Sequence, residues 1–146
     1  MYKKIMVTLD NSPADRTILD HIQPLAKLTK AEIILVHVSD GFVAQLQDQL
    51  NLQDSEEIKD DRAYLEQETK NLAAENINVR SVLVQGKEPV EGILSVALEN
   101  QCDLIAMATH GHGPVQDLLL GSVADSLRHQ TSIPILMIRS GNLRHP

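Results

Sequence analysis

The sequence is poor in aromatic and in basic residues. It contains two tyrosines, one phenylalanine and no tryptophan in 146 residues. Flavin-binding proteins and proteins that bind single-stranded nucleic acid stack rings on aromatic side chains, so both classes are disfavoured. Basic residues number 13 against 20 acidic ones, which gives a net charge of −7. Because nucleic acids and anionic membranes attract basic surfaces, this charge argues against both as partners.

Cysteine and long apolar runs are also scarce. The one cysteine, Cys102, permits no internal disulfide, which is usual in a reducing compartment. No apolar run approaches the roughly 20 residues that span a bilayer. The first apolar run ends at Leu9, too early for a signal peptide. We therefore expect a cytoplasmic protein in which Cys102 is a buried, unreactive residue, with one domain over residues 1–146 and a flexible tail over 140–146.

Short apolar runs alternate with helical patterns along the chain. The runs at 4–9, 32–38, 79–84, 103–108 and 133–138 are typical of buried parallel strands. This alternation predicts an α/β fold, a doubly wound five-stranded parallel sheet sandwiched by helices in a Rossmann-like arrangement. Such folds bind ligands at the carboxyl ends of their strands.

Helix signals occur between these runs. Ser12 is expected as an N-cap with Pro13 at the first helical position, and Glu88-Pro89 opens another helix. The charged stretch 54–75 predicts a long amphipathic helix with a solvated acidic face. The stretch 39–53 fits either a short helix or an ordered loop.

The segment 108–123 contains the strongest candidate motif. It leaves a strand, passes through Gly111 and enters a helix near Gly121-Ser122. Glycine allows the main chain to approach an anion closely, and a helix N-terminus offers free N–H groups and a favourable dipole. The segment therefore indicates either a phosphate site, with the Ser122 hydroxyl as an added donor, or an ordinary strand-to-helix loop.

This motif resembles that of ATP-binding universal stress proteins, in which Gly, two residues, Gly and nine residues precede Gly-Ser or Gly-Thr. Gly111 and Gly121-Ser122 match the spacing, whereas Ala108 stands in place of the first glycine. The resemblance extends over nearly the whole chain, including Lys-Ile-Met-Val-Thr-Leu-Asp-Asn-Ser, Ile-Leu-Val-His-Val and Ile-Pro-Ile-Leu-Met-Ile. It implies an adenine-nucleotide α-hydrolase-like fold, ATP binding and a regulatory role in stress responses.

The resemblance also implies which residues line the nucleotide site. Asp10 matches the acidic residue that lies against the nucleotide, and Val38 matches the position whose backbone contacts the adenine edge. The remaining positions match residues that line the cleft or contact the ribose and phosphates. The full set is Thr8, Leu9, Asp10, Val38, Met107, Ala108, Gly111, Gly121, Ser122 and Val123.

The phosphate region lacks compensating positive charge. No lysine or arginine occurs between Met107 and Leu127, and Asp117 and Asp125 are acidic. A helix dipole supplies only about half a charge. We therefore expect ATP to bind together with Mg²⁺ or Mn²⁺, held by Asp117 or by the phosphates, with protonated His110 and His112 adding affinity. A transition-metal site at the two histidines is disfavoured, because catalytic zinc needs three protein ligands.

Other functions are less well supported. The chain lacks a P-loop and a nucleophile elbow, and no catalytic base stands beside the glycine loop, so we expect at most slow ATP hydrolysis. Ala108 and the uncompensated phosphate charge favour an alternative, a nucleotide-free dimeric interaction module. The apolar strand Ile133 to Ile138 is expected at the sheet edge, where it would pair with a second copy to form a homodimer. A regulatory protein partner is expected without being identified.

Overall fold

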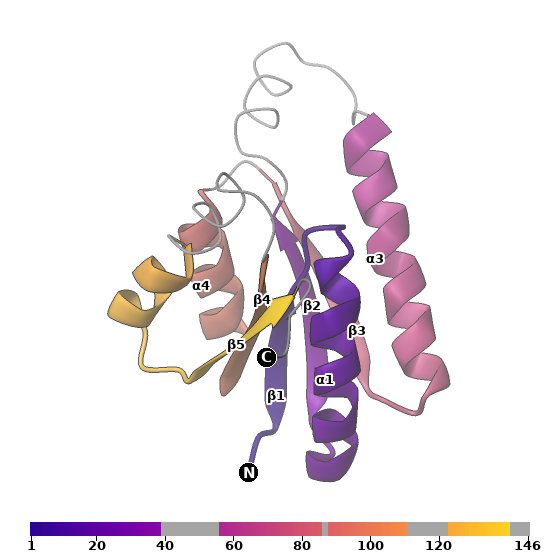
Figure 1. The fold of residues 1–146 in the computed structure, drawn as a ribbon, viewed down its shortest axis with the longest axis horizontal. Coiled ribbons are helices and arrows are strands. Elements are labelled where there is room, and N and C mark those ends of the chain that lie inside the picture. The colour runs from indigo at the N-terminus through magenta and orange to yellow at the C-terminus, as the bar shows by residue number, and fades with distance from the viewer. Residues whose placement is uncertain (39–55, 86–87, 111–122, 141–146) are drawn as a thin grey trace, which may run out of the picture.

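The structure is a computed structural model that describes residues 1–38, 56–85, 88–110 and 123–140. Its sheet consists of β1 Lys4–Thr8, β2 Glu32–Val38, β3 Val79–Val84, β4 Leu104–His110 and β5 Ile135–Ser140. The strands all pair in parallel, in the order β3-β2-β1-β4-β5. The chain thus winds outward from β1 in both directions, and the doubly wound fold predicted from the sequence is confirmed (Figure 1).

Helices cover both faces of this sheet. Helices α1 Ala14–Thr29 and α3 Glu56–Ala74 lie on one face, whereas α4 Pro89–Glu99 and the helix over residues 123–130 lie on the other (Figure 1). Because successive strand residues point to opposite faces, Ile5 and Val7 pack toward α1 and α3 while Met6 packs toward α4. In the described part of the chain, no helix is both long and apolar enough to cross a membrane.

Two helix starts were predicted, and one of them is shifted. α1 begins at Ala14, which puts Pro13 rather than Ser12 at the cap position, although Pro13 has the helical dihedrals expected of a first helical residue (φ −57°, ψ −20°). The Ser12 hydroxyl still accepts a hydrogen bond from the Ala14 N–H at 3.2 Å. At α4 the prediction is confirmed, and the Glu88 carboxylate accepts hydrogen bonds from the N–H groups of the first turn.

The last two strands extend further along the chain than predicted. β4 continues to His110, and β5 runs Ile135–Ser140 instead of starting at Ile133. Pro134 has no N–H to donate, so only its carbonyl joins the sheet, accepting from the Ile105 N–H at 3.0 Å. Ser140 belongs to the strand and not to a tail, since it is buried and its hydroxyl donates to the Thr109 carbonyl. Residues 39–53 and the tail from 141 onward lie outside the described residues.

Leu127 holds the helix over residues 123–130 against the sheet and is fully buried. We expect Leu127→Ala to lower the free energy of unfolding by about 3 kcal/mol, because the deletion leaves a cavity in the core. Leu98→Ala, at a leucine of α4 that is 67% exposed, is the matched control and should cost less than about 0.5 kcal/mol. Urea denaturation followed by circular dichroism measures both losses. Equal losses would contradict the placement of this helix.

Candidate functional site

The candidate site is the carboxyl-terminal edge of the sheet beside β1. β1 lies between β2 and β4, so the order of the strands reverses at this point. Open α/β sheets bind ligands at such a reversal, because the connections leave the edge in opposite directions. The Leu9 N–H donates to the Val36 carbonyl at 2.8 Å and continues the pairing of β1 with β2 past the end of the strand.

The structure brings together the site residues predicted near the strand ends. Thr8, Leu9 and Asp10 lie at the end of β1, and Val38 is the last residue of β2. Met107 and Ala108 lie near the end of β4. The register pairs Val7 with Ala106, so Leu9 and Ala108 each follow two residues later along their strands. Val123 is the first described residue of the helix over residues 123–130, whereas Gly111, Gly121 and Ser122 lie outside the described residues, as do His112 and Asp117.

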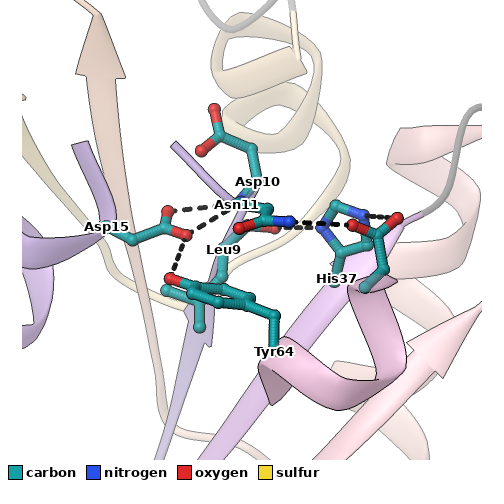
Figure 2. Close-up of polar contacts among 7 residues, drawn as sticks. Leu9, Asp10, Asn11, Asp15, His37 and Tyr64 are labelled. Carbon is teal, nitrogen blue, oxygen red and sulfur yellow. Dashed lines mark hydrogen bonds and ion pairs between the residues drawn. The ribbon is translucent and has the colours of Figure 1, made fainter. Parts of the chain in front are cut away.

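Three of these side chains are buried in the core. Leu9 is 4% exposed, Met107 1% and Ala108 7%. They can therefore offer only main-chain atoms to a ligand at this edge. Asp10 differs from them, because its side chain is exposed (Figure 2).

His37 links the end of β1 to α3. Its Nδ1 lies 2.8 Å from the Leu9 carbonyl oxygen and its Nε2 lies 2.9 Å from Oδ2 of Asp61, and both side chains are buried. Because a carbonyl can only accept, Nδ1–H is the donor to Leu9. The contact between Nε2 and Asp61 completes a short, buried connection between β2, β1 and α3.

Asp15 holds the turn that follows β1. Its carboxylate accepts hydrogen bonds from the Asp10 N–H at 3.1 Å, the Asn11 N–H at 2.9 Å and the Tyr64 hydroxyl at 2.6 Å (Figure 2). Asn11 has a φ of 61°, a left-handed conformation that is uncommon outside glycine. Its side-chain amide also donates to Oδ1 of Asp61 at 3.2 Å. We call the five side chains that hold this turn the β1-end network: Asn11, Asp15, His37, Asp61 and Tyr64.

This network was not predicted from the sequence. The acidic residues of 54–75 were expected to form a solvated face, but Asp61 is buried at 7% exposure. A signal was available, because Asp61 precedes the buried Leu65 by four residues and therefore shares its face of α3. Neither Asp15 nor His37 was among the predicted site residues.

Two further features do not contribute to the site. Cys102 is buried, as expected, and burial raises the pKa of its thiol to about 11. A cavity of about 470 Å³ lies at the opposite edge of the sheet, lined mainly by the last turns of α1 and α3 and including Lys27, Glu75 and Asn76. Helix C-termini carry partial negative charge, which disfavours an anionic ligand there.

Known proteins resemble this chain in both sequence and fold. The model of the universal stress protein family matches residues 1–139. This chain belongs to the universal stress protein family. It is 29% identical to universal stress protein MJ0577 of Methanocaldococcus jannaschii over 160 residues, covering 97% of this chain and 98% of that protein. The solved structure of MJ0577 matches this universal stress protein with a TM-score of 0.73 at 28% identity, over 97% and 99% of the two chains.

Two other solved universal stress proteins share the fold. One, from Archaeoglobus fulgidus, was solved in complex with dAMP and has a TM-score of 0.69 at 22% identity, over 94% of this chain and 98% of that one. The other was solved in complex with cAMP and also has a TM-score of 0.69, at 18% identity over 96% and 98%.

The His37–Asp61 contact provides a test of the β1-end network. We expect Asp61→Ala to lower the free energy of unfolding by roughly 3 kcal/mol, because it leaves a buried imidazole and the Asn11 amide without their acceptor. The matched control is Glu75→Ala, which breaks the exposed Lys27–Glu75 ion pair at 3.0 Å and should cost less than about 1 kcal/mol. Urea denaturation at pH 7 compares the two variants. A loss for Asp61→Ala no larger than for Glu75→Ala would show that the buried contact does not form.

Proposed function

We propose that this universal stress protein binds an adenine nucleotide, ATP with Mg²⁺ or Mn²⁺, at the carboxyl-terminal edge of the sheet, and that it regulates a stress response in the cytoplasm. The observation that carries the proposal is the juxtaposition of Asp10, Val38 and Ala108 at the reversal of strand order. The dAMP and cAMP complexes of proteins with the same fold support an adenine-containing ligand.

The buried side chains around the site favour recognition through the main chain. The backbone of Val38 would meet the adenine edge, and the backbone of Met107 and Ala108 would lie beneath the ribose and first phosphate. Gly111 and Gly121-Ser122 would place N–H groups around the remaining phosphates. Val123 is the first described residue of the helix over residues 123–130 and would lie beside the phosphates.

A divalent cation would balance the remaining negative charge. Among the described residues, no group of three or more His, Cys, Asp and Glu side chains is arranged to hold a metal ion. This suits Mg²⁺, which keeps several waters and binds chiefly through phosphate oxygens with one or two carboxylates. The cation would therefore arrive with the triphosphate, held by its oxygens or by Asp117.

Titration calorimetry tests the proposed ligand. The wild type should bind Mg·ATP, and Gly121→Val should weaken binding by about tenfold or more, because a branched side chain keeps the main chain from the phosphates. Gly141→Val, outside the proposed loop, is the control and should bind as the wild type does. Removing Mg²⁺ with EDTA should weaken ATP binding and leave adenosine binding unchanged. A wild type that binds no adenine nucleotide at millimolar concentration would reject the proposal and favour the nucleotide-free interaction module.

We also propose a homodimer that pairs through β5. β5 occupies the edge of the sheet next to β4, and it presents an apolar strand in which Met137 is 50% exposed. Exposed apolar edge strands readily pair with another chain, because their backbone N–H and C=O groups are available for a further ladder.

Met137→Lys should shift the protein from dimer to monomer, because it places a charge on the pairing strand without opening the core. Leu28→Lys introduces the same charge at an 81% exposed leucine of α1, away from this edge, and should leave the dimer intact. Light scattering at micromolar concentration measures the mass of each. A monomeric wild type, or a Met137→Lys variant with unchanged mass, would rule out this interface.

A further inference from the structure

Asp15 is a buried carboxylate that accepts hydrogen bonds from residues earlier in the chain. It lies in the first turn of α1 and is 3% exposed. Two of its three donors are the main-chain N–H groups of Asp10 and Asn11, which precede the helix. Its carboxylate therefore determines the shape of the turn that presents Asp10, in addition to any effect on the helix.

That turn does not have a conformation that the chain would adopt without help. Asn11 lies in the left-handed region at φ 61°. Non-glycine residues persist there only where surrounding contacts hold them. The Asn11 backbone is held by Asp15 and its side chain by Asp61, so both contacts converge on one residue.

We propose that Asp15 is a positioning residue for the nucleotide: while ionised, it holds the Asp10–Asn11 turn in the shape that receives adenosine, and protonation of Asp15 loosens this turn. The inference rests on the proposed function, since it concerns the affinity of the same site. Asp15 acts through the main chain of Asp10 and Asn11 and does not itself touch the ligand.

The pKa of Asp15 sets the pH range over which the turn should loosen. Burial raises the pKa of Asp15 from its usual 3.8 to about 6, and the nearby Asp10 charge adds to the rise. The hydrogen bonds from Tyr64 and from the Asp10 backbone oppose it. A proton added below pH 6 either displaces a backbone N–H or turns the Tyr64 hydroxyl into an acceptor. In both cases the carboxylate charge that strengthens the hydrogen bonds to the turn is lost.

The charged and titratable groups around Asp15 come from each neighbouring element. Asp10 lies on the β1 turn, Tyr64 and then Glu68 lie on α3, and the His37–Asp61 pair lies on the far side of Asn11. Only Asp10 and Tyr64 act on Asp15 directly in the described residues. The charge of Asp10 raises the pKa of Asp15, whereas the hydrogen bond from the Tyr64 hydroxyl lowers it. Removing the Tyr64 hydroxyl should therefore disfavour the ionised form of Asp15.

Stability and affinity should respond to pH in opposite directions. A carboxyl whose pKa is raised by folding stabilises the protein when protonated, so this contribution is present below pH 3.8 and is lost as pH rises through about 6. The proposed contribution to adenosine affinity instead appears as pH rises through about 6. A purely structural role for Asp15 would move both quantities together.

The experiment compares the wild type with Asp15→Asn by calorimetry between pH 5 and 8, with adenosine and ATP as the probes. Asparagine keeps the shape of the side chain but turns an amide NH₂ toward a backbone donor. The ratio of the two Kd values cancels the titration of the ligand. We expect Asp15→Asn to bind about tenfold more weakly at pH 8 and about equally at pH 5. The control Asp20→Asn removes an exposed carboxylate from the same helix and should match the wild type at both pH values.

A second variant keeps the test decisive if Asp15→Asn does not fold. Tyr64→Phe retains the ring and removes the hydroxyl that favours the ionised carboxylate, so the pH at which affinity falls should move upward. A Kd ratio that does not change with pH, or an unmoved pH profile in Tyr64→Phe, would overturn the role of Asp15 while nucleotide binding stands. If the wild type binds neither adenosine nor ATP, the proposed function fails and this inference fails with it.

Discussion

The reversal of strand order beside β1 is the constraint on which the rest of the structure depends. A parallel crossover is right-handed, so connections that lead in opposite directions along the sheet lie on opposite faces. Accordingly α1, which joins β1 to β2, covers one face, and the helix over residues 123–130, which precedes β5, covers the other. The helices that follow β1 and β4 therefore cover opposite faces, and the ends of these two strands lie side by side between them.

The β1-end network gives this edge a defined geometry. Asp15, His37 and Asp61 are buried polar groups in a core that is otherwise apolar, and each is hydrogen-bonded. Buried polar groups of this kind are costly unless satisfied, so they favour one arrangement of the turn over its alternatives. Since Asp61 and Tyr64 lie on α3, the same contacts couple the position of that helix to the turn after β1.

The sequence was sufficient to predict the fold because its pattern is repeated and local. Each buried strand is a short apolar run, and the position of β5 at the sheet edge followed from the family resemblance and topology. The ends of elements were less predictable, since Pro134 and Ser140 depend on pairing with β4. The predicted residues at the strand ends do lie at one edge, but the burial of Leu9 and Met107 limits them to main-chain contacts.

The polar network was missed for a physical reason. Charged residues on a helix are usually solvated, and the spacing of Asp61 from Leu65 indicates a shared face of α3 without indicating a buried polar partner. Its burial depends on His37, 24 residues earlier on β2, and on Asn11 beyond β1. Contacts between elements so far apart become visible only once the sheet order is known.

Amide chemical-shift mapping is the most direct test of the proposed site. Adding AMP to ¹⁵N-labelled protein should shift the amide resonances of Asp10, Val38 and Ala108 at the carboxyl-terminal edge. The amides of Lys4, Glu32 and Asn76, near the opposite edge, should stay in place. Shifts confined to that opposite edge, or no shifts at millimolar AMP and ATP, would contradict nucleotide binding at the reversal of strand order.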